Sequence, residues 1–531
     1  MVKEFEDRPK KQTGEGPGAH MGQMSPYCHP PHIIKGDGYK SAGAVGSLKD
    51  SCSGQPPLKN SDTVAPLALQ QSVCSRANAT HKKDKGTRMD HHHPHRIVIV
   101  GGGAGGLQLA TRLGRKLKRH KQIEVVLVDA RMTHLWKPLI HEVAAGSLNS
   151  YSDELSYLAQ ASWNGFRFVP GQMVALDRTK RTISLTSPPE SGGDNSPQPV
   201  RQISYNTLVL AVGSCANDFA TPGAREHCYF LDSREQAERL HQRIMGYALT
   251  RLGGEEEKAL ATIDIAIIGA GATGVELAAE LHRALSLMQQ YGLAWQPGAV
   301  TITLIERGER ILPGLSERVS QKIQARLDAT GIKTLTQTGV LKVAHNGLQL
   351  GDQSHLATDI TIWAAGIKAP AFLAQLDGLA HNQINQLNVT AALHTPADPN
   401  IFALGDCACC SLVDGDNTYT VPPRAQAAHQ QAAHLARTLV SRIAEGVPST
   451  ELPPFRYRDR GSLVSLSNHS AVGQLMGNLT GPVLLEGKLA RLFYISLYRL
   501  HQLTLYGPFR TGLLIARNLL RRGTSPRLKL H

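Results

Sequence analysis

The stretch Arg96–Gly106, RIVIVGGGAGG, constrains the fold of this 531-residue chain more than any other. Its four apolar residues, Ile97–Val100, predict a buried parallel strand, and the glycines that follow have the spacing G-x-G-x-x-G. In such a turn the first glycine permits the bend and the second lets the backbone approach a pyrophosphate. The third lets the next helix pack on the strand. The sequence therefore predicts a dinucleotide site at Gly101, Gly103 and Gly106.

The residues after this turn complete a strand–helix–strand unit. A helical stretch from Leu107 to about Lys118 leads to the strand Ile123–Val128, which ends in Asp129. A carboxylate at that place can accept hydrogen bonds from a ribose diol. A glycine-rich turn that serves packing alone is the alternative, and the complete unit favours the dinucleotide site.

The same unit occurs again in IDIAIIGAGATG, residues 263–274. Gly269, Gly271 and Gly274 repeat the spacing, a helical stretch follows, and the strand Val300–Ile305 ends in Glu306. A hydride donor and its acceptor must be stacked closely. Two dinucleotide sites in one chain therefore predict that one holds a flavin and that the other presents a nicotinamide to it.

Several shorter stretches predict how the chain connects these units. Two buried strands are predicted to end in small residues, namely Tyr205–Gly213 and Thr361–Gly366. Turns of small residues of this kind touch a cofactor where a chain crosses between dinucleotide domains. A third apolar strand, Asn400–Asp406, is capped by glycine and aspartate. A small antiparallel meander is predicted from Phe166–Val169, Met173–Asp177, Thr182–Thr186 and Val200–Ser204.

The stretch Val421–Gln431, VPPRAQAAHQQ, predicts a helix that begins after two prolines. Its alanines give a small-residue face that permits close packing. Gln426 and Gln430 lie four residues apart and so share a face of this helix. Solvent exposure is the plain alternative for both glutamines.

The net charge of +14 gathers at the C-terminal end, where residues 486–531 hold nine Lys or Arg and one acidic residue, hence +8. No recognisable nucleic-acid motif accompanies this charge, so we expect anionic lipid and no nucleic acid as partner.

Eight cysteines in so long a chain favour a reducing compartment over a disulfide scaffold. Residues 1–94 lack apolar periodicity and are predicted to be disordered. A metal at His91, His92, His93 and His95 is the weaker alternative to a polar lead-in, and no metal is expected.

Taken together, these motifs resemble type II NADH dehydrogenase, the single-subunit, non-proton-pumping respiratory NADH:quinone oxidoreductase of bacteria. The likeness covers about residues 95–531. It is carried by long stretches, among them THLWKPLIHEVAAGSL, IGAGATGVELAAELH, WAAGIKAP, ALGDCA, VPPRAQAAHQ and ARLFYISLYR. The resemblance implies FAD in the first unit, NADH in the second and a membrane quinone as electron acceptor.

The resemblance also implies site residues. Those toward FAD are Gly101, Gly103, Gly106, Asp129, Lys137, Gly213, Gly405 and Asp406. Those toward NADH are Gly269, Gly271, Gly274, Glu306, Ala365 and Gly366. Glu276 matches an acidic residue near the nicotinamide and quinone, although a helix N-terminal carboxylate stabilised by the dipole is the alternative. Ala425, Gln426 and Gln430 match a motif beside the isoalloxazine ring and the quinone opening.

The expected fold class is α/β, with two Rossmann-like dinucleotide-binding domains of the pyridine nucleotide-disulfide oxidoreductase type. The expected parts are a disordered extension (1–94), an FAD-binding domain in two pieces (95–220 and 366–455) and an NADH-binding domain between them (221–365). A C-terminal membrane-associating region (456–531) completes the chain.

The stretch Lys488–Arg522 predicts one or two helices lying in the membrane interface, because it has no apolar run long enough to span. Its apolar residues recur at helical spacing, namely Leu489, Leu492, Phe493, Leu497, Leu500 and Thr504. Gly507 and Pro508 break the pattern, and Tyr494, Tyr498 and Tyr506 are expected at headgroup level. A core-facing helix or a homodimer interface is the alternative. Because NADH is made in the cytosol, we expect peripheral attachment to the cytoplasmic face of the inner membrane.

Other functions of the same superfamily stay open at this point. A dithiol–disulfide reductase needs a cysteine pair near the flavin, and Ala130–Leu148 has no cysteine. A sulfide:quinone oxidoreductase-like flavoprotein would use distant cysteines, for which the candidates are Cys215, Cys407, Cys409 and Cys410. A non-respiratory NADH-dependent flavoprotein or signalling scaffold is the third alternative. NADH-dependent quinone reduction separates them all.

Overall fold

The computed structural model describes residues 94–148, 154–187, 200–251, 262–291, 298–448, 451–467, 471–477 and 481–521, all within the compact unit Arg88–His531. The predicted disordered extension lies outside these residues except for its last position, and so do His91, His92 and His93. His95 begins strand β1 (His95–Val100), and its Nε2 lies 3.1 Å from the Thr207 hydroxyl.

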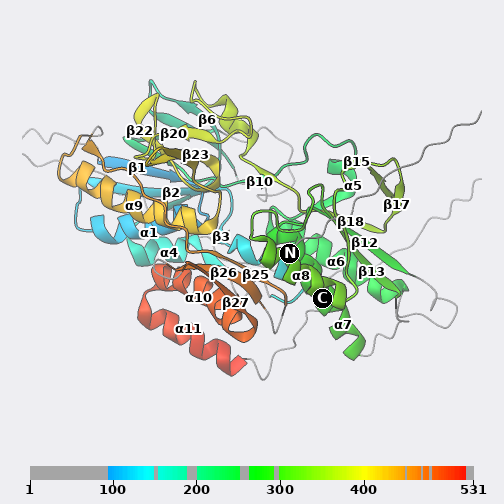
Figure 1. The fold of residues 1–531 in the computed structure, drawn as a ribbon. Coiled ribbons are helices and arrows are strands. Elements are labelled where there is room, and N and C mark those ends of the chain that lie inside the picture. Colours follow the sequence, from blue (N-terminus) through cyan, green and yellow to red (C-terminus); the bar gives the residue numbers. More distant parts are fainter. Residues whose placement is uncertain are drawn as a thin grey trace, which may run out of the picture. The chain divides into compact units, whose positions relative to one another are not determined.

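A six-stranded sheet carries the first glycine motif, in the order β21-β22-β9-β1-β2-β5. The central strands β9, β1, β2 and β22 are parallel, and Ile97–Val100 is buried, as expected for a strand covered on both faces. Helices α1 and α9 lie side by side against this sheet (Figure 1). The bounds are β2 (Ile123–Asp129), β9 (Thr207–Leu210), β21 (His394–Thr395), β22 (Asp398–Ala403), α1 (Ala104–Leu117) and α9 (Ala425–Ala444).

The predicted antiparallel meander is present but smaller than expected. It consists of β6 (Gln172–Asp177), β7 (Thr182–Thr186) and β8 (Arg201–Ser204). The expectation for Phe166–Val169 was wrong, because β5 (Arg167–Pro170) pairs in parallel with β2 at the edge of the large sheet. A short apolar run predicts a strand but not its partner, and here Phe166 and Phe168 are buried in the core of that sheet.

A second, five-stranded parallel sheet carries the other glycine motif, in the order β11-β18-β12-β13-β14. Its strands are β11 (Cys228–Phe230), β12 (Ile263–Ile268), β13 (Val300–Ile305), β14 (Lys333–Leu335) and β18 (Ile360–Trp363). Its helices are α6 (Arg234–Arg251), α7 (Ala272–Gln290) and α8 (Glu317–Ala329). Where the chain passes between the two sheets, β10 (Cys215–Ala216) pairs with β19 (Ile367–Lys368). The predicted domain boundaries at 220 and 365 lie near these crossings and stay predictions.

Short elements connect and cover the two sheets. Near the first sheet these are β3 (Thr133–His134), η1 (Lys137–Leu139), β4 (Leu155–Ser156), α4 (Tyr157–Asn164), η3 (Ala371–Gln375), β20 (Leu387–Val389), η4 (Gly405–Cys407), β23 (Ala408–Asp414) and β24 (Asn417–Thr420). Near the second they are α2 (Ile140–Ala144), which packs against α6 and α7, α5 (Ala224–His227), β15 (Val340–Ala344), β16 (Gly347–Leu350) and β17 (His355–Ala357).

The C-terminal part combines a small sheet with two helices. β25 (Ser462–Ser465), β26 (Ala471–Gly477) and β27 (Gly481–Glu486) form an antiparallel sheet that the sequence analysis did not anticipate. α10 (Gly487–Tyr506) and α11 (Pro508–Arg521) follow it and are separated at Gly507 (φ +78°), where the break was predicted. Over the described part of the chain, no helix is both long and apolar enough to cross a membrane.

Candidate functional site

The two glycine turns have the same backbone geometry. Gly101 and Gly269 both have φ +102°, a conformation that side chains rarely tolerate. A Cβ atom on either glycine would overlap the backbone of the neighbouring small-residue turn, at Ala211 for the first and at Ala365 for the second. Each first glycine is therefore required by its turn, whatever ligand binds there.

The second and third glycines of one motif have the same surroundings as those of the other motif. A Cβ on Gly106 or on Gly274 would collide with the carbonyl oxygen of the first glycine of its own motif. Gly103 and Gly271 instead open helices α1 and α7, and a Cβ there would meet nothing within 4 Å. The middle glycines thus leave open space at a helix N-terminus, where backbone N–H groups favour a phosphate. Both turns fit a dinucleotide.

Asp129 and Glu306 are held in place by matching hydrogen bonds. The Gly102 N–H donates to Asp129 Oδ2 (2.6 Å) and the Ala270 N–H to Glu306 Oε2 (2.9 Å). The N–H two residues after each acid donates to its other oxygen. Each carboxylate oxygen keeps a second lone pair, so both acids can still accept a ribose hydroxyl.

A polar cluster lies where the first sheet meets the crossing strands. Ser214 follows Gly213 (φ +72°), and its hydroxyl donates to Asp406 Oδ2 at 2.9 Å. Lys137 Nζ donates to the Ser214 carbonyl oxygen at 2.9 Å and lies 3.3 Å from Asp232 Oδ1. Burial raises the pKa of Asp406, and the charge of Lys137 opposes this rise. The structure thus brings together the predicted residues Lys137, Gly213 and Asp406.

Sequence reasoning missed the side chain that holds Gly405. Gln431 is 2% exposed, and its Oε1 accepts from the Gly405 N–H at 2.7 Å. Gly405 itself has φ +75° and lies against Ala428 of α9. Gln431 stands next to Gln430 in the sequence, but it faces the sheet because one residue turns a helix by 100°.

The predicted pair Gln426 and Gln430 shares a face of α9, as expected, and that face is covered. Gln430 exchanges two hydrogen bonds with the backbone of Arg458 (2.8 and 3.0 Å). Gln426 donates to Asp459 Oδ1 and to the Gly461 carbonyl oxygen, and accepts from the Arg460 N–H. The two amides therefore fix the segment before β25 to the start of α9.

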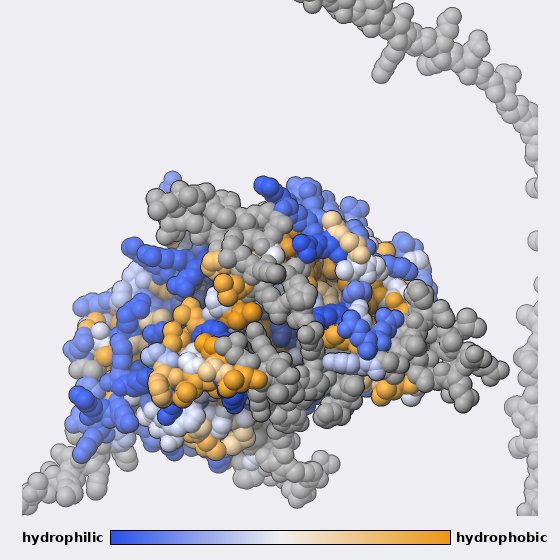
Figure 2. All heavy atoms as spheres, turned by 90° about the horizontal axis from the view of Figure 1, so that it is seen from below, coloured by the Kyte–Doolittle hydropathy of each residue, from blue (hydrophilic) through white to orange (hydrophobic). Residues whose placement is uncertain are grey.

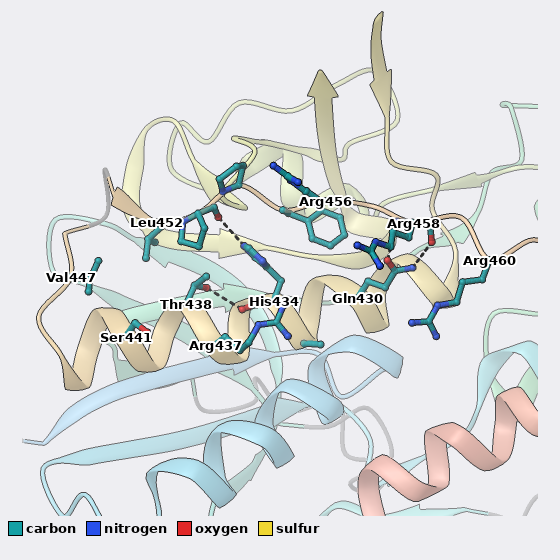
Figure 3. A pocket seen from close by; sticks show the side chains of 14 residues that line it. Gln430, His434, Arg437, Thr438, Ser441, Val447, Leu452, Arg456, Arg458 and Arg460 are labelled. Atoms are coloured by element: carbon teal, nitrogen blue, oxygen red, sulfur yellow. Dashed lines mark hydrogen bonds between the residues drawn. The ribbon is translucent and has the colours of Figure 1, made fainter. Parts of the chain in front are cut away.

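Gln430 also lines a cavity of about 650 Å³ between α9 and residues 447–460 (Figure 3). Arg437, Arg456, Arg458 and Arg460 line it, and no carboxylate is among its lining residues. In this view α9 separates most of the cavity from α1. The cavity is therefore a basic surface feature on the side of α9 away from the first glycine turn.

Glu276 does not lie among the residues of the second glycine turn. It is 7% exposed on α7, where its Oε1 accepts from the Ser465 N–H of β25 at 3.0 Å. His141 Nδ1 of α2 lies 3.7 Å from Oε2. Burial raises the pKa of Glu276 to about 8 and lowers that of His141 to about 4, so both groups are neutral at pH 7. A helix-dipole carboxylate would show the opposite shift.

The cysteines proposed for sulfur chemistry are thiols in the structure. Cys407 is buried and contacts the Leu210 and Leu404 carbonyl oxygens, and burial raises the pKa of its thiol to about 11. Burial also raises the pKa of Cys215, and raises that of Cys410 to about 12. Thiols held protonated are poor nucleophiles, which counts against the sulfide-oxidising alternative. Among the described residues, no group of three or more His, Cys, Asp or Glu could hold a metal ion.

Two equivalent glycine turns, each beside its own parallel sheet, define an oxidoreductase with two dinucleotide-binding domains. In agreement, residues 95–432 match the family described as pyridine nucleotide-disulphide oxidoreductase. The structure also resembles NDH2 from Plasmodium falciparum, solved in complex with NADH, with a TM-score of 0.69 at 19% identity. That likeness covers 82% of this chain and 100% of the other, and it supports the fold.

Curated relatives narrow this class to one family. The chain is 41% identical over 450 residues to the type II NADH:quinone oxidoreductase of Haemophilus influenzae. This alignment covers 82% of this chain and 99% of the relative. It is 31% identical over 415 residues to the demethylphylloquinone reductase NdbB of a Synechocystis strain, covering 77% and 94%. The chain belongs to the type II NADH:quinone oxidoreductases.

Proposed function

We infer that this chain is an FAD-dependent NADH:quinone oxidoreductase. The observation that carries this inference is the duplicated glycine turn with its matched carboxylate, in a chain that belongs to this family. FAD, when bound, accepts a hydride from NADH and passes two electrons to the quinone. The protein contributes binding, orientation and proton supply.

We propose which residues hold the two dinucleotides. Gly101, Gly103 and Gly106 would face the FAD pyrophosphate, with Asp129 at a ribose and the cluster around Asp406 toward the flavin end. For NADH the corresponding residues are Gly269, Gly271, Gly274, Glu306, Ala365 and Gly366. Helix N-termini at both turns direct N–H groups to the phosphates.

We propose that Glu276 holds a proton for the quinone. Quinone reduction consumes two protons as well as two electrons, and a carboxylic acid that is neutral at pH 7 can donate one. The Ser465 N–H fixes Oε1, which leaves Oε2 on the side of His141. Tyr494 of α10 lies close to Glu276: burial raises the pKa of its phenol, and Glu276 raises it further once ionised.

We also propose that α10 and α11 attach the protein to the cytoplasmic face of the membrane. Apolar side chains are exposed along both helices, among them Leu492, Leu500, Phe509, Leu513 and Leu520. Hydrophobic residues gather on this face of the molecule, interspersed with hydrophilic ones (Figure 2). Arg510 and Arg517 lie among them on α11 and suit anionic lipid.

The tyrosines of α10 pack partly against the rest of the protein, and their expected place at headgroup level stays a prediction. Burial raises the pKa of Tyr494 well above its ordinary value. The Tyr498 ring packs against Trp136 and the Tyr506 ring against Trp163, with centroids 6.3 and 6.0 Å apart. These contacts hold α10 against the rest of the protein, while the exposed side chains proposed to meet the membrane are leucine, phenylalanine and arginine.

The experiment that tests the activity is a cofactor analysis followed by two half-reactions of the purified protein. We expect bound FAD, bleaching of its absorbance by NADH under anaerobic conditions, and recovery of the absorbance on adding a quinone. Benzoquinones and naphthoquinones should be compared as acceptors. A protein that binds no flavin, or whose flavin NADH cannot bleach, would contradict the assignment.

A further inference from the structure

Three histidines from distant parts of the chain form a hydrogen-bonded series. His134 Nε2 lies 3.1 Å from His501 Nε2, and His501 Nδ1 lies 3.1 Å from His429 Nε2. At the other end, His134 Nδ1 lies 2.9 Å from the carbonyl oxygen of Gly102. His134 and His501 are buried, and Trp136 stacks on His501 with ring centroids 4.2 Å apart. The series connects β3, α10 and α9 to the first glycine turn.

The series has one consistent arrangement of protons when all three rings are neutral. A carbonyl oxygen can only accept, so His134 donates from Nδ1 and must accept at Nε2. His501 therefore donates from Nε2 and accepts at Nδ1 from His429. Burial lowers the pKa of His134 and His429 to about 4 and that of His501 well below its ordinary value. The neutral form is thus the one that exists at pH 7.

The bond to Gly102 determines the direction of the next N–H group. A trans peptide is planar, so its carbonyl and its N–H point in opposite directions. The Gly102 carbonyl oxygen accepts from both His134 and the Tyr157 hydroxyl, each at 2.9 Å. The N–H of Gly103 consequently points the opposite way, and a Cβ on Gly103 would meet open space. This N–H is one of the donors proposed to face the FAD pyrophosphate.

We propose that His501 of α10 is a positioning residue for FAD, because it fixes the tautomer and orientation of His134, which in turn aims the Gly103 N–H at the pyrophosphate. This inference rests on the proposed function of the first glycine turn as the FAD site. According to this inference, α10 contributes to FAD binding in addition to presenting the apolar surface proposed to meet the membrane.

The histidine series should orient the Gly103 N–H only while its rings are neutral. A further proton on His134 Nε2 or on His501 Nδ1 would place two N–H donors against each other. The charged groups around the series are of both signs. Arg112 and Arg460 lie near His429, and Asp129 accepts from the Gly102 N–H at the other end. Arg115 of α1 donates to the carbonyl oxygens of Thr504 and Leu505 on α10, and Arg499 of α10 donates to Gln502. Tyr157 and Tyr498 complete its polar surroundings. Because burial holds the pKa of His134 and His429 near 4 in the folded protein, the hydrogen-bonded series is intact above about pH 5 and is lost as the pH falls toward 4.

The test measures FAD affinity on the full-length protein, by fluorescence titration of the apoprotein without NADH or quinone. We expect His501→Phe, which keeps a ring but removes both nitrogens, to weaken FAD binding by about tenfold at pH 7.5. His501→Gln, which can still donate and accept, should recover most of that loss. Ser496→Ala, whose hydroxyl contacts only its own helix, is the matched control and should bind FAD like the wild type.

Two further measurements separate positioning from loss of folding. FAD affinity of the wild type should stay constant down to about pH 5 and decline below it as the rings gain protons near pH 4, while that of His501→Phe should change little. The double variant His134→Phe with His501→Phe should bind FAD about as weakly as either single variant, because both act through one path. Equal affinity of His501→Phe and wild type, additive losses or identical pH profiles would each overturn the inference. A wild type that binds no FAD would instead overturn the proposed function.

Discussion

At the scale of single residues, we propose that Glu306 selects NADH over NADPH at the second glycine turn. Its carboxylate is fixed by the Ala270 and Gly308 N–H groups at the end of β13, where it would accept from a ribose 2′-hydroxyl and repel a 2′-phosphate. We expect the wild type to prefer NADH. Glu306→Ala should lower the ratio of kcat/KM for NADH over NADPH by about tenfold or more, because a charge-assisted hydrogen bond is lost.

Arg307 provides the control for this prediction. It is exposed beside Glu306, and an arginine can pair with a 2′-phosphate. Arg307→Ala in the Glu306→Ala background should therefore reduce NADPH turnover again. Comparable kcat/KM values for both nucleotides in the wild type would contradict the role given to Glu306.

Glu276 makes folding stability depend on pH in a defined direction. Its pKa is about 8 in the folded protein against an ordinary 4.5, so the folded state keeps a proton that the unfolded chain releases. Between these values the free energy of unfolding falls as the pH rises, by up to about 1.4 kcal/mol per pH unit. Glu276→Gln should remove this slope. Thermal or urea unfolding of both proteins from pH 5 to 8.5 measures it, and parallel curves would refute the assigned protonation state.

Residue identity could be predicted where backbone geometry demands it and not where tertiary contacts decide. The glycines and the two carboxylates follow from spacing, because a turn and a ribose impose them. Gln431 and His134 carry no such local signature. Their partners, Gly405 and Gly102, lie 26 and 32 residues away along the chain. Only the folded sheet brings them together.

At the scale of elements, α9 presents two faces with separable roles. Gln426 and Gln430 hold the segment before β25, while Gln431 holds Gly405. We expect Gln426→Ala or Gln430→Ala to slow flavin reoxidation by quinone several-fold, with flavin reduction by NADH preserved. Stopped-flow absorbance measures both half-reactions.

The matched variant for this prediction is Gln431→Ala. It removes the acceptor of the Gly405 N–H and should weaken FAD retention, with little effect specific to quinone. Loss of FAD from the Gln426 and Gln430 variants as well would mean that all three glutamines act through packing of α9 and would exclude a quinone-side role.

Elements with long periodic patterns were predicted well, and short ones were not. α10 and α11 meet at the expected break, and both glycine turns open the expected helices. The prediction failed for β5, whose partner lies far away in sequence, and it missed the sheet β25–β27. Short strands depend on pairing that no local periodicity encodes.

At the scale of the whole molecule, we propose that the exposed apolar side chains of α11 attach the protein to the membrane. Phe509→Asp together with Leu513→Asp places two negative charges on this surface, and both side chains are exposed, so folding should persist. We expect the double variant to lose most of its co-sedimentation with vesicles containing anionic lipid. It should reduce a short-chain, water-soluble quinone at the wild-type rate.

Leu341→Asp is the control, because Leu341 is an exposed leucine of similar kind on β15. It should leave vesicle binding unchanged. If the α11 variant still binds vesicles but sediments as a smaller species than the wild type, the surface is a contact between two copies of the chain instead of a membrane contact.

The equivalence of the two glycine turns has a consequence for inhibitors. A compound that imitates only a pyrophosphate would find the same φ angle, the same open space and the same helix end at Gly101–Gly106 and at Gly269–Gly274. Discrimination must come from what differs beside the turns. One difference is the single methylene by which Glu306 is longer than Asp129; the other is the histidine bond on Gly102. A selective compound for the NADH turn should therefore reach past the phosphates to the carboxylate.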